Sequence, residues 1–483
     1  MFQSNSVISA FALLGFVAAC SAPTASDSAN EGTAPELSSE TAELTRAPVE
    51  ITADMPTAGT NLIDLYTYFH TNPELSFKEI KSSSIMANEL ENLGFTVATG
   101  LGDTWTREKS MRDNGEVRDG VGGYGIVGVF ENGDGPTVLI RADMDALPVA
   151  ERTGVPHASQ VVDETWTGVS NGVMHACGHD IHMTSWVGTA RALIAAKDTW
   201  SGTLIMIGQP AEELGNGAKA MISDGLFERF PQPDYNLALH VSAGVPSGKV
   251  AYSSGFALAN VDSVDITVKG VGGHGAYPHT TKDPIVVGAS IVTAVQTLVS
   301  RNVNPQTPAV VTVGSFQAGA KHNIISDEAK LLLTVRSYDD ETRAMLLEGI
   351  ERIAKAQAMA FGAPEPEIFI EPDYTPSTYN DPTLAATAAA AISAAIGEEN
   401  ISQVEPVMGG EDFSQYGRTD AKIPSLIYWV GAVEPGKWQD AQDSELGLPS
   451  LHSPFFAPDY EATIETGVTS MTATALALFN EDG

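Results

Sequence analysis

Cysteine is nearly absent from this sequence, which has only Cys20 and Cys177 among its 483 residues. The fold therefore cannot rest on a framework of disulfides and needs a hydrophobic core. Basic residues are also scarce, with 26 Lys and Arg against 61 Asp and Glu and a formal net charge of −35. This charge repels nucleic acid and anionic lipid surfaces, so we expect no nucleic-acid partner. An acidic surface that maintains solubility explains the charge more simply than a cationic partner does.

The apolar run at residues 11–19 is too short to span a membrane permanently. It ends in small residues directly before Cys20, which is typical of an export signal and resembles a bacterial lipoprotein signal. Residues 1–10 depart from that pattern because they contain no Lys or Arg, and a simple secretory signal with an incidental Cys is the alternative. We expect residues 1–19 to be a signal peptide. The exported protein would then be lipidated at Cys20 and anchored to the periplasmic face of the outer membrane.

Residues 20–59 are rich in Ser, Thr, Ala, Glu and Pro and have almost no large apolar side chains. Such a segment cannot bury a core, so we expect a disordered tether. If Cys20 carries lipid, Cys177 is an unpaired thiol in an exported protein, where thiols are prone to oxidation. This predicts a functional role for Cys177.

Beyond the tether, short apolar runs alternate with helical patterns. Residues 138–140, 203–207 and 237–239 are typical of buried strands, and residues 183–194 and 217–223 are typical of helices. The alternation predicts an α/β domain with a mostly parallel sheet and helices on both faces.

The pattern changes near residue 257. The expected elements are a strand at 264–268, a helix from 284 to about 301, strands at 309–316 and 329–336, a helix at 340–361 and a strand at 367–370. The order β-α-β-β-α-β is that of a ferredoxin-like α+β domain. We therefore expect an inserted domain at residues 257–371 that interrupts a main domain formed by residues 60–256 and 372–483.

The densest chemical signal is the segment His-Ala-Cys-Gly-His-Asp-Ile-His at residues 175–182. It contains three His in a chain that has ten. Thiolate and imidazole are ligands that suit zinc and similar ions. Alternate residues such as Cys177 and His179 can point the same way from an extended turn. A polar loop that caps the next helix is the alternative interpretation.

Carboxylates follow two of the expected strands. Glu212 and Glu213 come after residues 203–207, and Asp143 comes after residues 138–140. At the carboxyl end of a strand, one carboxylate can bind a metal while its neighbour moves protons. An isolated Glu-Glu pair is more often a solvated helix start. Two further residues, His240 and His452, could bind a metal, although an isolated His in such a position is more often a hydrogen-bonded core residue.

Together these segments resemble the dinuclear metallopeptidase superfamily of aminoacylase and glutamate carboxypeptidase. The similarity is to its branch of hippurate hydrolases and indole-acetyl amino acid amidohydrolases. The resembling segments are residues 70–76, 141–148, 175–182, 211–213, 239–240, 272–279, 408–413 and 451–454. They occur in the family's order and cover nearly everything from residue 61 to the C-terminus.

The resemblance implies an enzyme that hydrolyses the amide bond of N-acyl amino acids with two divalent ions, which could be zinc, manganese, cobalt or nickel. The implied metal ligands are Cys177, as the bridging ligand, with His179, Glu213, His240 and His452. Glu212 is the implied general base, and Asp143 is the acid that supports the metal site.

The resemblance also assigns roles to the inserted domain, which would be a lid that forms a homodimer. His274 would stabilise the oxyanion, often in the partner subunit's site. Asn323 and Arg336 would bind the carboxylate of the substrate.

Three segments depart from the family pattern and leave the substrate open: residues 103–119, residues 161–169, and a polar loop expected at residues 434–446. These insertions could line the rim of the pocket. A dipeptidase or carboxypeptidase of the same superfamily remains an alternative. A non-catalytic binding lipoprotein is a second one.

Overall fold

The computed structural model describes residues 55–442 and 447–480. The predicted signal peptide, the predicted lipidation site Cys20 and most of the predicted tether lie outside these ranges.

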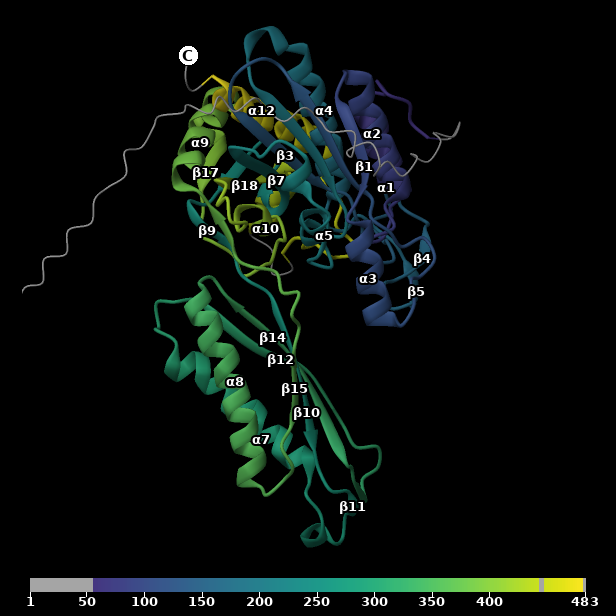
Figure 1. Cartoon of the computed structure of the whole chain (residues 1–483), viewed down its shortest axis with the longest axis vertical. Coiled ribbons are helices and arrows are strands. Elements are labelled where there is room, and N and C mark those ends of the chain that lie inside the picture. Colours follow the sequence, from purple (N-terminus) through teal and green to yellow (C-terminus); the bar gives the residue numbers. More distant parts are fainter. Residues whose placement is uncertain (1–54, 443–446, 481–483) are drawn as a thin grey trace, which may run out of the picture. The chain divides into compact units, whose positions relative to one another are not determined.

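Eight strands form the central sheet, in the order β1-β2-β6-β3-β7-β18-β8-β17 (Figure 1). Their bounds, in chain order, are β1 Thr96–Leu101, β2 Gly125–Glu131, β3 Thr137–Asp143, β6 Thr203–Gln209, β7 Tyr235–Pro246, β8 Val250–Tyr252, β17 Ile401–Gln403 and β18 Ser425–Val433. Four of the seven neighbouring pairs are parallel, namely β6–β3, β3–β7, β7–β18 and β8–β17. The predicted mostly parallel sheet is confirmed.

Alternate side chains of the central strands enter two different cores. Ile140 and Met206 belong to one core, whereas Leu139 and Ile205 belong to the other, as the period of two in a strand requires. The helices that share the first core are α1 Leu62–Thr71, α2 Ile80–Leu93, α4 His179–Ala195, α9 Pro382–Ile396 and α12 Tyr460–Phe479. The second core contains α5 Gly217–Ser223, α6 Leu226–Arg229 and α10 Ser414–Gly417. Helices on both faces explain why the central strands are continuously apolar.

A separate four-stranded antiparallel sheet has the order β12-β14-β10-β15. Its elements are β10 Asp262–Lys269, α7 Pro284–Thr297, β12 Ala309–Ala318, β14 Glu328–Ser337, α8 Asp340–Ala360 and β15 Glu367–Ile370. Both helices pack on the same face of this sheet and close its apolar core (Figure 1). The chain order is the predicted β-α-β-β-α-β. A short pair, β11 Gly273–His274 with β13 Ile324–Ile325, stands apart from the sheet.

Local sequence explains how the helices start. Asp381 caps α9 by accepting the N–H groups of Thr383 and Leu384, and Asp283 caps α7 in the same way through Ile285. In both helices a proline follows the cap, where its missing N–H costs nothing.

The segments that depart from the family pattern are largely ordered. Residues 103–119 contain α3 Asp103–Asn114, and residues 161–169 belong to the hairpin of β4 Val162–Glu164 and β5 Ser170–Gly172. The polar loop expected at residues 434–446 is wrong in part, because Pro435–Gln442 form helix α11. Glu434 accepts the N–H groups of Gly436 and Lys437 and so caps this helix. The remaining pair is β9 Gly255–Leu258 with β16 Thr378–Asn380. The chain passes through β9 before it enters the second sheet and through β16 after it leaves that sheet.

Candidate metal centre

The segment around Cys177 is a tight turn that leads into α4. Gly178 has φ 82°, and a Cβ atom there would lie 2.5 Å from Cγ2 of Val241 on β7. Only glycine accepts both the left-handed backbone and this close approach. The turn therefore places Cys177 just before the helix and His179 in its first turn, against the strand that carries His240.

Five predicted ligands converge in two groups that share one thiol. Cys177, His179 and His240 form the first group, and Cys177, Glu213 and His452 form the second. In each group the candidate ligand atoms lie within 4.8 Å of one another. The Sγ atom of Cys177 is 3.5 Å from Nε2 of His240 and 3.3 Å from Nε2 of His452. This is the arrangement that a thiolate shared by two ions requires.

Two of the histidines are oriented by carbonyl groups. Nδ1 of His179 donates to the Asp145 carbonyl over 2.7 Å, and Nδ1 of His240 donates to the Val241 carbonyl over 2.7 Å. A proton on Nδ1 leaves the Nε2 lone pair available to a metal. Nε2 of His240 is 3.5 Å from the Cys177 thiol, and both histidines belong to the first group.

Two buried polar atoms without hydrogen-bond partners indicate that metal ions fit between the two ligand groups. Nε2 of His179 and Oε1 of Glu213 are buried and have no hydrogen-bond partner among the described residues. Such atoms are rare because burial without a partner is costly. Burial raises the pKa of the Cys177 thiol, and Glu213 and Glu212 raise it further, so a cation is needed to favour the thiolate. One thiolate, three imidazoles and one carboxylate fit two divalent ions of the zinc, manganese, cobalt or nickel type.

Asp145 holds the turn that follows β6. Its carboxylate accepts the N–H of Glu212 over 3.0 Å and the N–H of Glu213 over 3.0 Å. Ala211, just before them, has φ 51°, and its N–H donates to Oε1 of Glu79 over 2.8 Å. A left-handed alanine is uncommon and persists only where its surroundings impose it. The sequence places Asp145, like Asp143, after the strand at residues 138–140, but it predicts a role for Asp143 alone.

Asp143 lies beside the predicted ligand His179, with 3.6 Å between Oδ2 and Nε2. It accepts Nδ1 of His182 over 2.6 Å, and Nε2 of His182 accepts the N–H of Val241 over 2.9 Å. Burial lowers the pKa of His182 to about 3, so the ring is neutral at pH 7. Both nitrogens of His182 are therefore engaged, and this histidine connects α4, β3 and β7 while its ring packs against that of His240, with centroids 4.6 Å apart.

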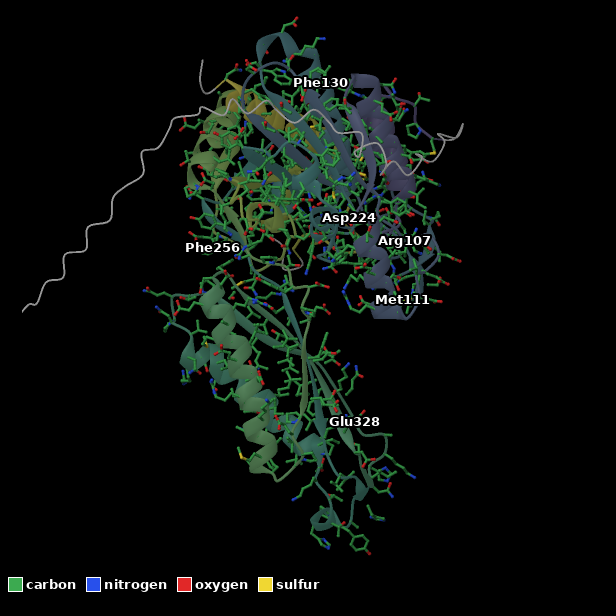
Figure 2. The ribbon with its side chains drawn as sticks, in the orientation of Figure 1. Arg107, Met111, Phe130, Asp224, Phe256 and Glu328 are labelled. Carbon is green, nitrogen blue, oxygen red and sulfur yellow. The ribbon has the colours of Figure 1, made fainter. Side chains whose placement is uncertain are left out.

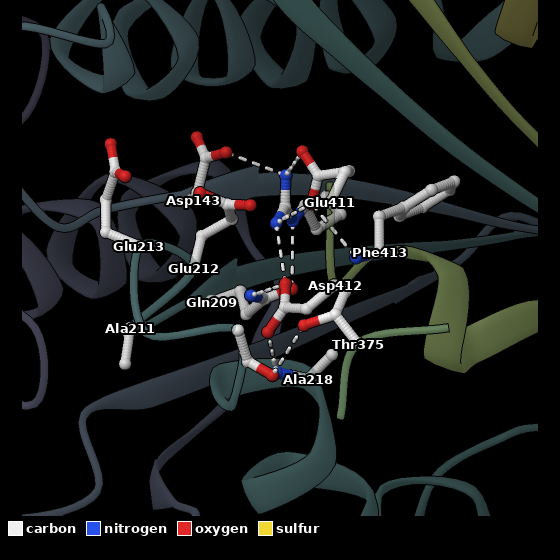
Figure 3. Close-up of polar contacts among 12 residues, drawn as sticks. Asp143, Gln209, Ala211, Glu212, Glu213, Ala218, Thr375, Glu411, Asp412 and Phe413 are labelled. Carbon is white, nitrogen blue, oxygen red and sulfur yellow. Dashed lines mark hydrogen bonds and ion pairs between the residues drawn. The ribbon is translucent and has the colours of Figure 1, made fainter. Parts of the chain in front are cut away.

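A buried cation lies beside Glu212. Arg141 is 2% exposed, and its guanidinium is 2.8 Å from Asp143, 2.8 Å from Glu411 and 3.2 Å from Asp412. Figure 3 shows these carboxylates next to Glu212. Burial raises the pKa of Glu212 well above its usual range, with Glu411 the largest charge contribution. Glu212 is thus placed in surroundings that favour uptake of a proton.

The two groups open into a pocket of about 270 Å³ that is lined by Cys177, Glu212, Glu213, His240, His452, Glu411 and Arg336 with their neighbours. Arg336, predicted to bind substrate, therefore reaches the pocket. The predicted residues His274 and Asn323 are not among its lining residues. Both are exposed and lie near the β11–β13 pair, where the Gly275 N–H donates to the Asn323 carbonyl over 2.9 Å.

Comparison with known proteins agrees with this geometry. Residues 139–476, more than half of the chain, match the family described as Peptidase family M20/M25/M40. A hippurate hydrolase from Campylobacter jejuni is 38% identical over 347 residues, 71% of this chain and 82% of the relative. Thermostable carboxypeptidase 2 from Saccharolobus solfataricus is 36% identical over 372 residues, 77% of this chain and 85% of the relative.

A solved structure is also similar. It is a dinuclear metal-binding peptidase of the M20 family from Bacillus subtilis, with a TM-score of 0.64 and 29% identity. The match covers 86% of this chain and 96% of that one. None of these similarities supports the alternative of a non-catalytic binding protein. The chain belongs to peptidase family M20/M25/M40 and is a hydrolase of that family.

Proposed function

We propose that this hydrolase cleaves the amide bond of N-acyl amino acids and uses two divalent ions. The observation that carries the proposal is the pair of ligand groups that share Cys177 and open into a pocket with Glu212 and Arg336. The relative named hippurate hydrolase supports the substrate class.

When bound, the two ions would lower the pKa of water toward neutrality and polarise the amide carbonyl. Glu212 takes the proton of the water and passes it to the leaving amine, a role that its raised pKa favours. Asp145 holds the backbone of Glu212 and thereby limits its motion during this transfer. Arg336 pairs with the carboxylate of the amino acid.

The test is a hydrolysis assay of the purified protein on N-acetyl, N-benzoyl and indole-acetyl amino acids beside simple dipeptides. Each substrate is assayed as purified, after chelation, and after addition of zinc, manganese, cobalt or nickel. We expect cleavage of acyl-amino acids that chelation removes and one of the metals restores. Turnover that survives full metal removal would rule out the proposed chemistry.

A carboxypeptidase is the second candidate, because a relative of that name is 36% identical to this chain. The same assay separates the two candidates. Faster cleavage of dipeptides than of every acyl-amino acid would favour the peptidase.

We further propose a homodimer formed by the inserted domain, with His274 stabilising the oxyanion in the partner subunit's site. Support comes from apolar side chains that this domain exposes, such as Tyr277, which is 57% exposed, and Ile324, which is 54% exposed. Both lie close to His274 in the chain or in the β11–β13 pair. Light scattering of the purified protein would give the mass of the assembly.

We also propose lipid attachment at Cys20 and a location at the periplasmic face of the outer membrane. The support is the small-residue sequence before Cys20. Cys20→Ser should move the protein from the membrane fraction to the soluble fraction. An unchanged distribution would contradict the anchor.

A further inference from the structure

A second pocket, of about 220 Å³, adjoins the metal pocket. The two pockets share Leu214, Val261 and Thr375 in their linings. Leu214 directly follows the candidate ligand Glu213 and is 37% exposed. A molecule whose reacting bond lies at the metal ligands could therefore extend past Leu214 into this second pocket.

The outer wall of the second pocket comes from two of the insertions. Helix α3 supplies Lys109 and Asp113, and the hairpin β4–β5 supplies Trp166. Nε1 of Trp166 donates to Asp113 over 3.3 Å, and the indole packs on Phe77 with ring centroids 5.5 Å apart. These contacts join the two insertions to each other and to the main domain, so the wall is preformed.

The second pocket contains a cation that is held in place. The Lys109 side chain is 8% exposed, and its Nζ is 3.0 Å from Asp113 and 4.0 Å from Asp373. Asp373 is also paired with Arg112 over 2.6 Å and with Lys219. Asp113 and Asp373 are thus paired with cations, whereas Glu371, which also lines the pocket, has no such pair among the described residues. The pocket presents the Lys109 ammonium group together with the rings of Trp166 and Tyr374.

We propose that the second pocket receives the acyl group of the substrate and selects a planar aromatic one. This inference rests on the proposed function. Arg336 lines the metal pocket and is not among the lining residues of the second. If Arg336 binds the carboxylate of the amino acid, the amino acid half of the substrate stays in the metal pocket. The acyl half lies on the other side of the reacting amide and can extend past Leu214.

An aromatic ring fits these walls better than an aliphatic chain does. A ring can stack on Trp166 and accept the Lys109 ammonium on its face. An aliphatic chain would remove water from Lys109 and its carboxylates without any compensating contact. A cavity of about 150 Å³ already holds a benzene molecule, so the volume is sufficient for a benzoyl group.

The test compares kcat/KM for the N-benzoyl and N-acetyl derivatives of the same amino acid, because an acetyl group has no ring to stack on Trp166. In the metal-loaded wild type the benzoyl derivative should be preferred. Trp166→Ala should lower the benzoyl-to-acetyl ratio about tenfold, whereas Trp166→Phe should keep most of it. Both rate constants come from one preparation, so any loss of folded enzyme cancels in the ratio.

Val169→Ala and Met111→Ala are matched controls, because these residues lie on the same insertions but are 61% and 52% exposed and do not line the pocket. Figure 2 labels Met111 on α3. Both controls should keep the wild-type ratio. An unchanged ratio in Trp166→Ala, with both substrates still cleaved, overturns this inference and leaves the proposed function intact. Failure of the metal-loaded wild type to cleave any N-acyl amino acid overturns the proposed function, and this inference with it.

Discussion

At the scale of single residues, the thiol of Cys177 connects the two ligand groups. It is the one cysteine among residues 55–442 and 447–480, and it is buried. Its contacts with His240 and His452 give a physical reason for this thiol at this position. A metal bound to this thiol would also protect it from oxidation, because its lone pairs would be engaged.

Cys177→Ala should lower the metal content of the purified protein, because it removes the ligand that both groups share. Cys177→Asp should restore part of it, because a carboxylate can bridge two ions. Elemental analysis of both variants beside the wild type gives the answer. Full loading of Cys177→Ala would exclude the thiolate as a ligand.

Glu212→Gln should reduce kcat at least about a hundredfold while the metal content stays at the wild-type level. The amide has nearly the same shape as the carboxylate but cannot accept the proton of the water. Steady-state kinetics and elemental analysis on one preparation separate the two effects. Substantial turnover in this variant would contradict the assignment of Glu212 as the general base.

At the scale of elements, Arg141 joins β3 to the loop before α10 by contacts with Glu411 and Asp412. Arg141→Leu leaves buried carboxylates without their cation and should lower the free energy of unfolding by about 3–5 kcal/mol. Denaturant unfolding measures the change.

Arg107→Leu is the control for Arg141. Arg107, labelled in Figure 2, pairs with Asp103 at the surface, where its side chain is 43% exposed. Its loss should change stability by less than about 1 kcal/mol. Equal effects of the two substitutions would show that the Arg141 contacts are not a significant source of stability.

The contact between α1 and α4 predicts a pH dependence of stability. His70 on α1 is 2.7 Å from Asp180 on α4 and 3.2 Å from Glu151. Burial alone would lower the pKa of His70, but the hydrogen bonds with Asp180 and Glu151 outweigh it and raise the pKa to about 10. A histidine with a raised pKa stabilises the folded state fully below its unfolded pKa of about 6.5. This contribution is lost as the pH rises toward 10.

The free energy of unfolding should therefore fall between pH 6.5 and pH 10 in the wild type, and fall less steeply in His70→Gln. The variant should be less stable than the wild type at pH 6.5, and the difference should shrink at pH 10. Denaturant midpoints at three pH values test this. Parallel pH profiles for the two proteins would contradict the predicted ionisation of His70.

At the scale of the whole molecule, His274 lies on the β11–β13 pair, whereas the predicted ligand His240 lies on β7 of the central sheet, and His274 does not line the pocket. If the site is completed by the partner subunit, a mixture of two inactive variants should recover activity. Glu212→Gln keeps His274, and His274→Ala keeps Glu212, so a mixed dimer has one complete site.

Co-expression of Glu212→Gln and His274→Ala in equal amounts should give about a quarter of the wild-type activity, because half of the random dimers have one complete site of two. Each variant alone is the control. Activity no higher than that of the separate variants would place His274 outside the partner's site.

The sequence by itself determined the fold class and the family. Apolar runs with a period of two, helix caps such as Asp381-Pro382, and the order of the motifs are local or linear properties, so they can be read without a structure. The helix Pro435–Gln442 was predicted as a loop because its composition is polar. The sequence contains a helix-start signal, since Pro435 directly follows Glu434, which caps the helix.

Only the tertiary structure decided which residues surround the candidate site. Arg141 and Glu411 are 270 positions apart, and no local pattern pairs them. The support of Glu212 by Asp145 depends on how the turns after β3 and β6 meet. The second pocket forms because two insertions fold against residues 371–375, and burial and distance at such a junction are properties of packing that a linear pattern does not encode.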